Sequence, residues 1–118
     1  MRVLLGTVFA VMILTGCGQS DESKDQLDSI ARVRVAKEGV QKNLVDPNSA
    51  EFRDVHVYKN GANGKIVCGY VNAKNRLGGF TGYEEFISIG KTTVLKSQGD
   101  PDFNSIWQSD CNNRYLVY

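Results

Sequence analysis

The chain has 118 residues, with 14 Lys and Arg against 13 Asp and Glu, which gives a formal net charge of +1. This length suits one small domain with a modest core, because a chain of this size buries roughly 60–68% of its unfolded surface. The near-zero charge and the dispersed basic residues argue against nucleic-acid binding, which needs a basic face.

The start of the chain carries the most informative pattern. A single Arg2 is followed by an apolar run over residues 3–14, and small residues then precede Cys17. Such a pattern is typical of a secretory signal, and the run is too short for a permanent transmembrane helix. The motif Leu14-Thr15-Gly16-Cys17 resembles the lipobox of bacterial lipoproteins.

This resemblance implies that Cys17 carries acyl chains such as palmitate and that the chain is cut after Gly16. Residues 1–16 are then the signal peptide, residues 17–23 a lipidated cysteine with a flexible polar tether, and residues 24–118 a single domain. The protein would be anchored in the membrane of the bacterial envelope by its lipid. Gly18, where inner-membrane lipoproteins carry aspartate, implies the periplasmic face of the outer membrane. The alternative is an ordinary secretory signal that is cut elsewhere and leaves Cys17 as a thiol.

A helix is predicted from about residue 25 to residue 45. Its apolar residues recur at steps of three and four, which defines one stripe; they are Ile30, Val33, Ala36, Val40 and Leu44. Gly39 weakens this helix by about 1 kcal/mol relative to Ala. Asp46-Pro47 ends it, because the residue before a proline avoids helical geometry.

Strands are predicted next. In the first, residues 52–58, simple alternation directs Val55 and Val57 to one face and places Phe52 on the other with Asp54, His56 and Tyr58. In the second strand, residues 65–73, one face carries Ile66, Cys68 and Tyr70 and the other carries Val67 and Val71. Turn-forming residues between the first and second strands indicate an antiparallel hairpin. The third covers residues 83–89. Residues 92–95 either extend it past a bulge at Gly90 or form a fourth strand.

A short helix begins near Asp100-Pro101, where Phe103, Ile106 and Trp107 share one face. It ends at Cys111, and residues 115–118 add an edge strand. The predicted fold class is therefore α+β, with an N-terminal helix on a small antiparallel sheet of three to four strands and a short C-terminal helix tied by a disulfide.

That disulfide would join Cys68 to Cys111. Export places both cysteines in an oxidising compartment, where an even pair usually forms a bridge. The bridge would stabilise the fold by roughly 4 kcal/mol in the chain-entropy model. A metal site or a redox pair are the rival interpretations. A metal site needs more ligands than His56, the single histidine, can add, and a redox motif needs two cysteines spaced two apart.

Patterns for catalysis fail along the whole chain. Gly90-Lys91-Thr92 lacks the earlier glycine of a phosphate-binding loop, since position 85 is Glu85. Glu84 and Glu85 point to opposite faces of a strand and cannot act on one bond. No nucleophile pattern surrounds His56. We therefore expect no enzyme activity, no cofactor, no metal ion and no small-molecule substrate.

The glycine-rich segment between the second and third strands is the candidate binding loop. Its conformational freedom suits a surface loop, and Phe80 and Tyr83 are candidate aromatic anchors for a partner protein. Arg76 and Leu77 complete the predicted site. The other interpretation is a plain connecting loop with no ligand.

A second resemblance rests on three segments of residues 40–87. Asp46-Pro47-Asn48-Ser49-Ala50-Glu51-Phe52 fits Asp-Pro-x-Ser-Ala-x-Phe, and the run from Val67 to Asn75 fits Val-Cys-Gly-x-Val-Asn-x-Lys-Asn, before a glycine-rich loop. These motifs resemble an uncharacterised family of small exported bacterial proteins and lipoproteins. The resemblance implies architecture and no catalytic residue.

The sequence thus predicts a lipid-anchored, non-enzymatic envelope lipoprotein that acts as a small binding or accessory module, with the membrane and an envelope protein as partners. The alternative is an inhibitor of a cell-wall hydrolase or an exclusion-type lipoprotein of a prophage.

Overall fold

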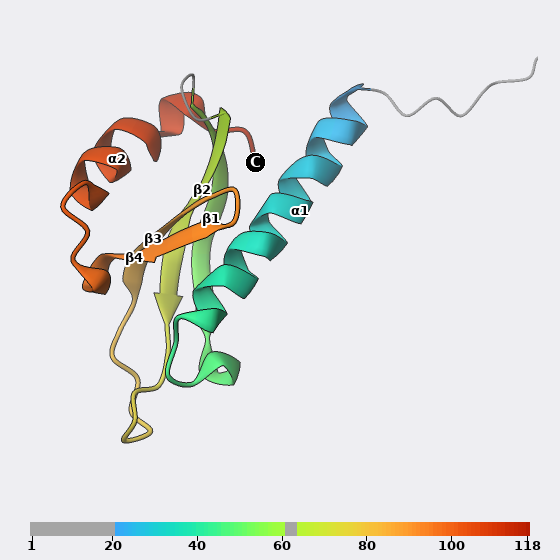
Figure 1. Cartoon of the computed structure of the whole chain (residues 1–118). Helices are drawn as coiled ribbons and strands as arrows, with labels where there is room; N and C mark the ends of the chain where they lie inside the picture. Colours follow the sequence, from blue (N-terminus) through green and yellow to red (C-terminus); the bar gives the residue numbers. More distant parts are fainter. Residues whose placement is uncertain (1–20, 61–63) are drawn as a thin grey trace, which may run out of the picture.

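Two helices cover opposite faces of a four-stranded antiparallel sheet (Figure 1). The computed structural model describes residues 21–60 and 64–118. The elements are α1 (Asp21–Lys42), β1 (Glu51–Asn60), β2 (Gly64–Asn72), β3 (Glu84–Ile89), β4 (Thr92–Leu95) and α2 (Phe103–Asp110). This arrangement confirms the predicted α+β fold, including the helix order and the disulfide at the C-terminal helix.

The strands follow one another in the sheet in chain order, β1-β2-β3-β4. β4 is a separate strand, because Gly90 and Lys91 form a two-residue turn that pairs Ile89 with Thr92. Gly90 has a φ of 60°, and glycine at the first central position is what the tight II′ hairpin turn requires. Of the two predicted outcomes for residues 92–95, the fourth strand is therefore correct.

β1 contains a bulge that changes which side chains face α1. Arg53 pairs with Tyr70 and His56 with Cys68, so one extra residue stands in β1 between these pairs. Asp54 takes a φ of 49°, a left-handed conformation that Asp tolerates better than most side chains. The bulge puts Phe52 on the α1 side, packed against the same core as Val57. The prediction for Phe52 was wrong, because simple alternation does not hold across an extra residue.

α1 packs on the sheet through one stripe, but the predicted stripe was wrong at its start. Ala36 and Val40 are fully buried, as expected, whereas Ile30 is 46% exposed and Ser29 is buried in its place. The seven-residue step from Ser29 to Ala36 keeps both on one face, and Ile30 lies about a third of a turn away. The helix begins at Asp21, so residues 21–23 of the expected tether are helical.

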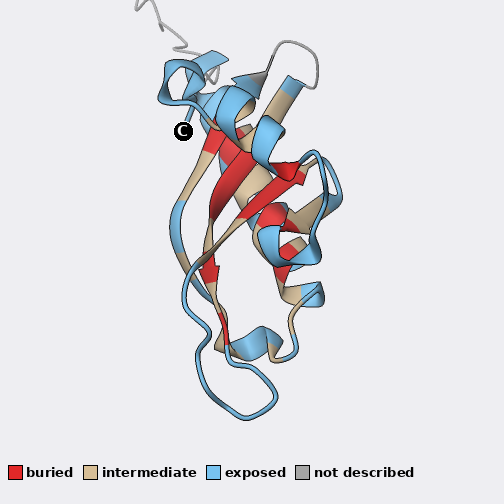
Figure 2. Cartoon of the chain, turned by 90° about the vertical axis from the view of Figure 1, so that its left-hand side faces the viewer, coloured by how far each residue is buried: buried red, intermediate tan, exposed pale blue. Residues whose placement is uncertain are grey.

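Two apolar clusters form, one under each helix. Figure 2 shows that buried segments lie mainly in the strands. The cluster under α1 is centred on Phe86, and the cluster under α2 on Ile66. Phe103 is buried there, with Ile106 and Trp107 packed against the cluster, which confirms the predicted face of the C-terminal helix.

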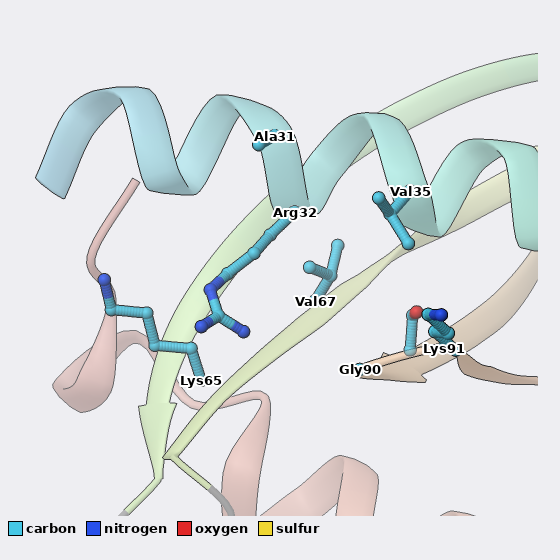
Figure 3. Close-up of a pocket in the computed structure, with 8 residues that line it drawn as sticks. Ala31, Arg32, Val35, Lys65, Val67, Gly90 and Lys91 are labelled. Atoms are coloured by element: carbon cyan, nitrogen blue, oxygen red, sulfur yellow. The ribbon is translucent and has the colours of Figure 1, made fainter. Parts of the chain in front are cut away.

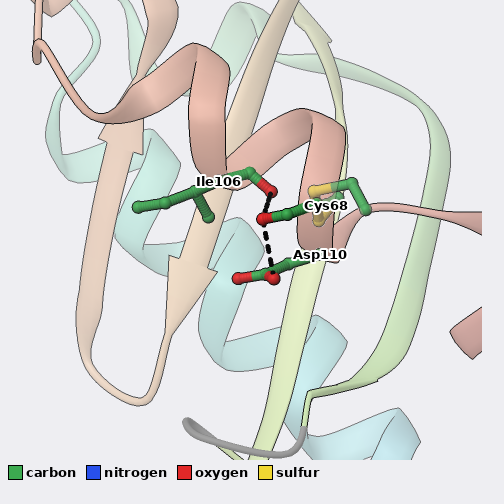
Figure 4. The surroundings of a disulfide bond; sticks show 5 residues. Cys68, Ile106 and Asp110 are labelled. Atoms are coloured by element: carbon green, nitrogen blue, oxygen red, sulfur yellow. Dashed lines mark hydrogen bonds between the residues drawn. A yellow bond between two sulfur atoms is a disulfide. The ribbon is translucent and has the colours of Figure 1, made fainter.

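The disulfide fastens α2 to the middle of the sheet (Figure 4). Cys68 on β2 is bonded to Cys111, which directly follows α2, with 6.0 Å between their Cα atoms. Beside it, the Ser109 hydroxyl donates to the Asp110 carboxylate (2.9 Å), within the last turn of the helix. The bridge predicted from the expected compartment and the even cysteine count is thus present.

The C-terminal segment follows the outer edge of β1 without forming a full strand. Val117 N donates to Val57 O (2.8 Å) and Val57 N to Tyr118 O (3.0 Å). A single bridge pairs Tyr58 with Leu116. The expected edge strand is therefore reduced to a short stretch of edge pairing, preceded by a 3₁₀ turn over Asn113–Tyr115.

Candidate protein-binding loop

The connection between β2 and β3, residues 73–83, projects past the end of the sheet and is called the tip loop here (Figure 1). It carries all four side chains of the predicted binding site. Leu77 is 95% exposed, Phe80 47% and Tyr83 40%, and Arg76 is exposed as well. Figure 2 shows residues 74–83 of the loop as a continuous exposed segment. None of its aromatic residues is buried in the domain core.

The tip loop is organised from within by one side chain. Asn75 Oδ1 accepts hydrogen bonds from Leu77 N (3.0 Å) and Gly79 N (3.1 Å). The backbone adds Asn75 N to Gly79 O (2.8 Å) and Gly78 N to Asn75 O (3.0 Å). Gly78 has a φ of 80°, a conformation that glycine adopts at little cost. Asn at the first position and Gly at the fourth are typical of a tight turn, so the apex is held in one shape.

Further hydrogen bonds attach the base of the tip loop to the domain. Asn72 Oδ1 accepts from Gly82 N (3.0 Å), across the two ends of the loop. Ser49, in the 3₁₀ turn before β1, accepts from Lys74 N through its hydroxyl (2.8 Å). These bonds pair backbone groups that would otherwise depend on water, and they fix the direction in which the loop leaves the sheet.

Cation–π contacts divide the four predicted residues into two pairs. The Arg53 guanidinium lies 4.2 Å from the centre of the Tyr83 ring and 5.4 Å from that of Tyr70. Lys74 Nζ lies 5.5 Å from the centre of the Phe80 ring. Tyr83 and Phe80 are therefore engaged within the domain and hold the loop. Arg76 and Leu77 are left facing outward.

The tip loop is electropositive. Between residues 73 and 83 the charged side chains are Lys74 and Arg76, with no acid among them. Glu84, the next carboxylate, accepts a hydrogen bond from Ser97 N (3.0 Å) and belongs to the sheet. Leu77 at the apex is apolar, and Lys74 and Arg76 near it are basic. This combination is complementary to a partner surface that is apolar at its centre and acidic at its rim.

The other residues tested for chemistry have structural contacts. Glu85 is paired with Lys96 (2.6 Å), and Glu84 accepts from the next residue, Ser97; both partners lie in η2 (Lys96–Gln98). His56 Nδ1 lies 3.1 Å from Tyr118 O, under the C-terminal segment. Burial raises the pKa of Tyr58, in the cluster under α2. Among residues 21–60 and 64–118, no group of three His, Cys, Asp or Glu side chains is placed to hold a metal ion.

Sequence reasoning missed the residues that organise the loop. The spacing of Asn75 and Gly78 is a recognisable turn signal and could have identified the turn. The role of Arg53 had no signal, because its position beside Tyr83 depends on the bulge at Asp54 and on sheet pairing.

Comparisons with family models, with curated proteins and with solved structures give no match to this chain. The lipobox and Cys17 lie outside the described residues. Within the described part, neither helix is both long and apolar enough to cross a membrane.

Proposed function

We propose that this chain is a lipid-anchored, non-enzymatic protein of the bacterial envelope that binds another envelope protein through the tip loop. The anchor rests on the resemblance of Leu14-Thr15-Gly16-Cys17 to a lipobox. The binding role rests on one observation, which is the exposure of Leu77 at the apex of an internally hydrogen-bonded loop.

Two physical arguments support this role for Leu77. Burying a leucine side chain stabilises a protein or complex by about 1.5–3 kcal/mol, and that gain is unrealised at 95% exposure. The loop is also ordered before binding, because Asn75 accepts two of its amides. A preorganised loop loses less conformational entropy when it binds, which raises affinity.

The charge of the tip loop specifies the kind of partner. Arg76 and Lys74 favour a partner whose apolar pocket is bordered by Asp or Glu side chains. Leu77 would fill the pocket and Arg76 would pair with a carboxylate at its rim. The partner would lie in the same envelope, within reach of a domain that begins four residues after Cys17.

The test of the binding role uses the full chain in the bacteria that produce it. A photo-crosslinking amino acid replaces Leu77 in one variant and Leu27, which is 54% exposed on α1, in a control. The protein captured from position 77 is identified and purified, and its affinity for the chain is measured. We expect Leu77→Ala to weaken binding about tenfold or more, as for a central interface residue, and Leu27→Ala to have little effect. Equal capture at both positions, or unchanged affinity of Leu77→Ala, would refute the proposal.

The anchor has its own test. Mass spectrometry of the native protein should find an amino-terminal Cys17 carrying acyl chains, and Cys17→Ser should leave the membrane fraction. A chain that begins at another residue would remove the anchor and leave the binding test of the loop unaffected.

The tip loop also supports the alternative of an inhibitor. A narrow loop that stands clear of the sheet (Figure 1) has the shape needed to enter the cleft of a cell-wall hydrolase. The discriminating measurement is the activity of the captured partner on cell walls. Loss of that activity on addition of the protein, and its recovery with Leu77→Asp, would establish inhibition; full activity in the complex would establish an accessory role.

A further inference from the structure

A groove lies between the middle of α1 and the sheet (Figure 3). It reaches the turn between β3 and β4, which is at the other end of β3 from the tip loop. Its volume is about 240 Å³. Ala31 and Val35 line it from the helix, and Val67 lines it from β2. In Figure 3, Val35 points toward the sheet and Val67 points toward the helix, so that the two valines border the same space.

Small side chains leave this space open. Ala31 is short, and Gly90 at the hairpin turn has no neighbouring atom within 4 Å of where a Cβ would be. Val35 therefore remains 38% exposed although it is next to the core. The centre of the groove is apolar, and burying it under a ligand would recover the free energy that exposed apolar surface costs in water.

Cationic side chains surround the apolar centre. Lys65 Nζ and Arg32 Nε donate to the same oxygen of Asp28, at 2.8 Å and 2.9 Å. Hydrogen bonds from Lys65 and then from Arg32 lower the pKa of Asp28, so it is ionised at neutral pH. Lys91 is exposed at the hairpin turn and forms no ion pair within the described part of the chain. Asp28 is thus shared by two of these cations. Glu38 lies with Lys91 and Lys42 along the adjoining hollow, so a net positive charge remains around the groove.

A buried hydroxyl adds a directional polar group. Ser88 is 3% exposed, lines the groove, and accepts a hydrogen bond from the Thr93 hydroxyl (3.2 Å). Its own proton has no acceptor among the described contacts, so it can donate to an oxygen of a ligand.

From this arrangement we infer that the groove binds a small amphiphilic anion, an unbranched aliphatic carboxylate of medium length. The hydrocarbon chain lies between Val35 and Val67. The carboxylate lies near Lys91, with Ser88 as a further donor. A volume of 240 Å³ equals that of about eight water molecules, which suits a chain of about six to eight carbons. This inference does not depend on the tip loop or on the lipid anchor.

The charge and the size of the groove favour this ligand over two others. An organic cation would meet the surplus positive charge and be repelled. A partner helix or strand needs a larger surface than this short groove provides, since specific interfaces bury about 800 Å² per partner.

The test is photo-labelling of the full chain with octanoate that carries a terminal diazirine, followed by peptide mapping. We expect labelled residues in α1 and β2 around Val35 and Val67. Unmodified octanoate should compete, whereas 1-octanol and octyltrimethylammonium at the same concentration should not. Lys91→Glu should reduce labelling about tenfold, because it replaces an attraction with a repulsion.

Two further variants make the result interpretable. Ala31→Phe places a ring in the groove from an exposed helix position and should also abolish labelling, while the disulfide and the circular dichroism spectrum remain unchanged. Arg76→Glu makes the same charge change on the tip loop and should label like the unmodified chain. Labelling that is spread over the surface, that survives both groove variants, or that 1-octanol suppresses as well as octanoate does would overturn the inference.

Discussion

The substitution Asn75→Ala tests whether one side chain organises the tip loop. It removes the acceptor for two backbone amides, those of Leu77 and Gly79, at 3.0 Å and 3.1 Å. The backbone hydrogen bonds across the turn remain. Each lost hydrogen bond contributes about 0.5–1.5 kcal/mol, so the closed loop should lose about 2 kcal/mol relative to open conformations, which corresponds to about thirtyfold more opening.

Hydrogen exchange measured by NMR on the full chain gives the assay. The amides of Leu77 and Gly79 should exchange about thirtyfold faster in Asn75→Ala, because exchange follows local opening. Urea unfolding should show a free energy of unfolding that is lower by at most about 2 kcal/mol, because two hydrogen bonds are lost while the two central clusters, to which the loop contributes no residue, stay intact. Affinity for the captured partner should fall although Leu77 is unchanged, because the loop must then be ordered on binding.

A matched control comes from the C-terminal turn. Asn112 Oδ1 accepts from Arg114 N at 3.0 Å, so Asn112→Ala removes the same kind of contact at a distant site. It should leave exchange in the tip loop unchanged. If exchange at Leu77 and Gly79 in Asn75→Ala stays within about twofold of the unmodified chain, Asn75 does not organise the loop and the argument from preorganisation fails.

Three further predictions concern the fold. Replacing Cys68 and Cys111 by Ala should lower the free energy of unfolding by about 4 kcal/mol for a separation of 43 residues and shift the fluorescence of the single tryptophan to the red; an unchanged urea midpoint would contradict this. The pKa of Asp28 is lowered from 3.8 in the folded state, so ionised Asp28 stabilises the fold above that pH, and this stabilisation is lost as the pH falls. The difference in melting temperature between the unmodified chain and Asp28→Asn should therefore shrink in acid. A difference that stays constant with pH would count against the pairing of Asp28 with Lys65 and Arg32. Gly39→Ala should destabilise the chain, although Ala favours helices by about 1 kcal/mol, because its Cβ would overlap the Thr93 side chain. In a Thr93→Ala background the same change should be neutral or stabilising in urea unfolding, and a cost that persists there would show that the overlap is not the cause.

The features that the sequence predicted correctly depend on local patterns or on cysteine chemistry. Regular alternation along β2 directed Cys68 and Tyr70 to one face and Val67 and Val71 to the other, as found. Three apolar residues at helical spacing defined α2. The two cysteines that follow the expected signal peptide allow one internal bridge, and that bridge is present.

The errors arose where tertiary packing selects between local alternatives. Ile30 and Ser29 both fit the edge of a helical stripe, and the angle at which α1 crosses the sheet buries the smaller, polar one. Hydrophobicity alone favours Ile30. Phe52 was assigned to the wrong face because the extra residue at Asp54 leaves no trace in the pattern of apolar residues.

For the candidate binding loop, the sequence predicted an exposed segment but not the contacts that its residues make within the domain. The glycines indicated a loop, and Arg76 and Leu77 are exposed on it. Phe80 and Tyr83, the expected anchors for a partner, are partly exposed and also contact Lys74 and Arg53 within the domain. An aromatic residue in a loop sequence suggests that its ring makes a contact. Only the three-dimensional structure shows whether this contact includes a side chain of the same domain.

The distribution of covered surface restricts where this small domain can bind. α1 and α2 cover the two faces of the sheet, and the C-terminal segment pairs with the free edge of β1. The other edge is β4, whose four residues are too few to recruit another strand securely. What remains are the two ends of the sheet, where the tip loop projects at one and the groove lies near the other. One end is convex with an exposed leucine, and the other is concave with an apolar centre. The convex end therefore suits insertion into a protein, and the concave end suits a small molecule.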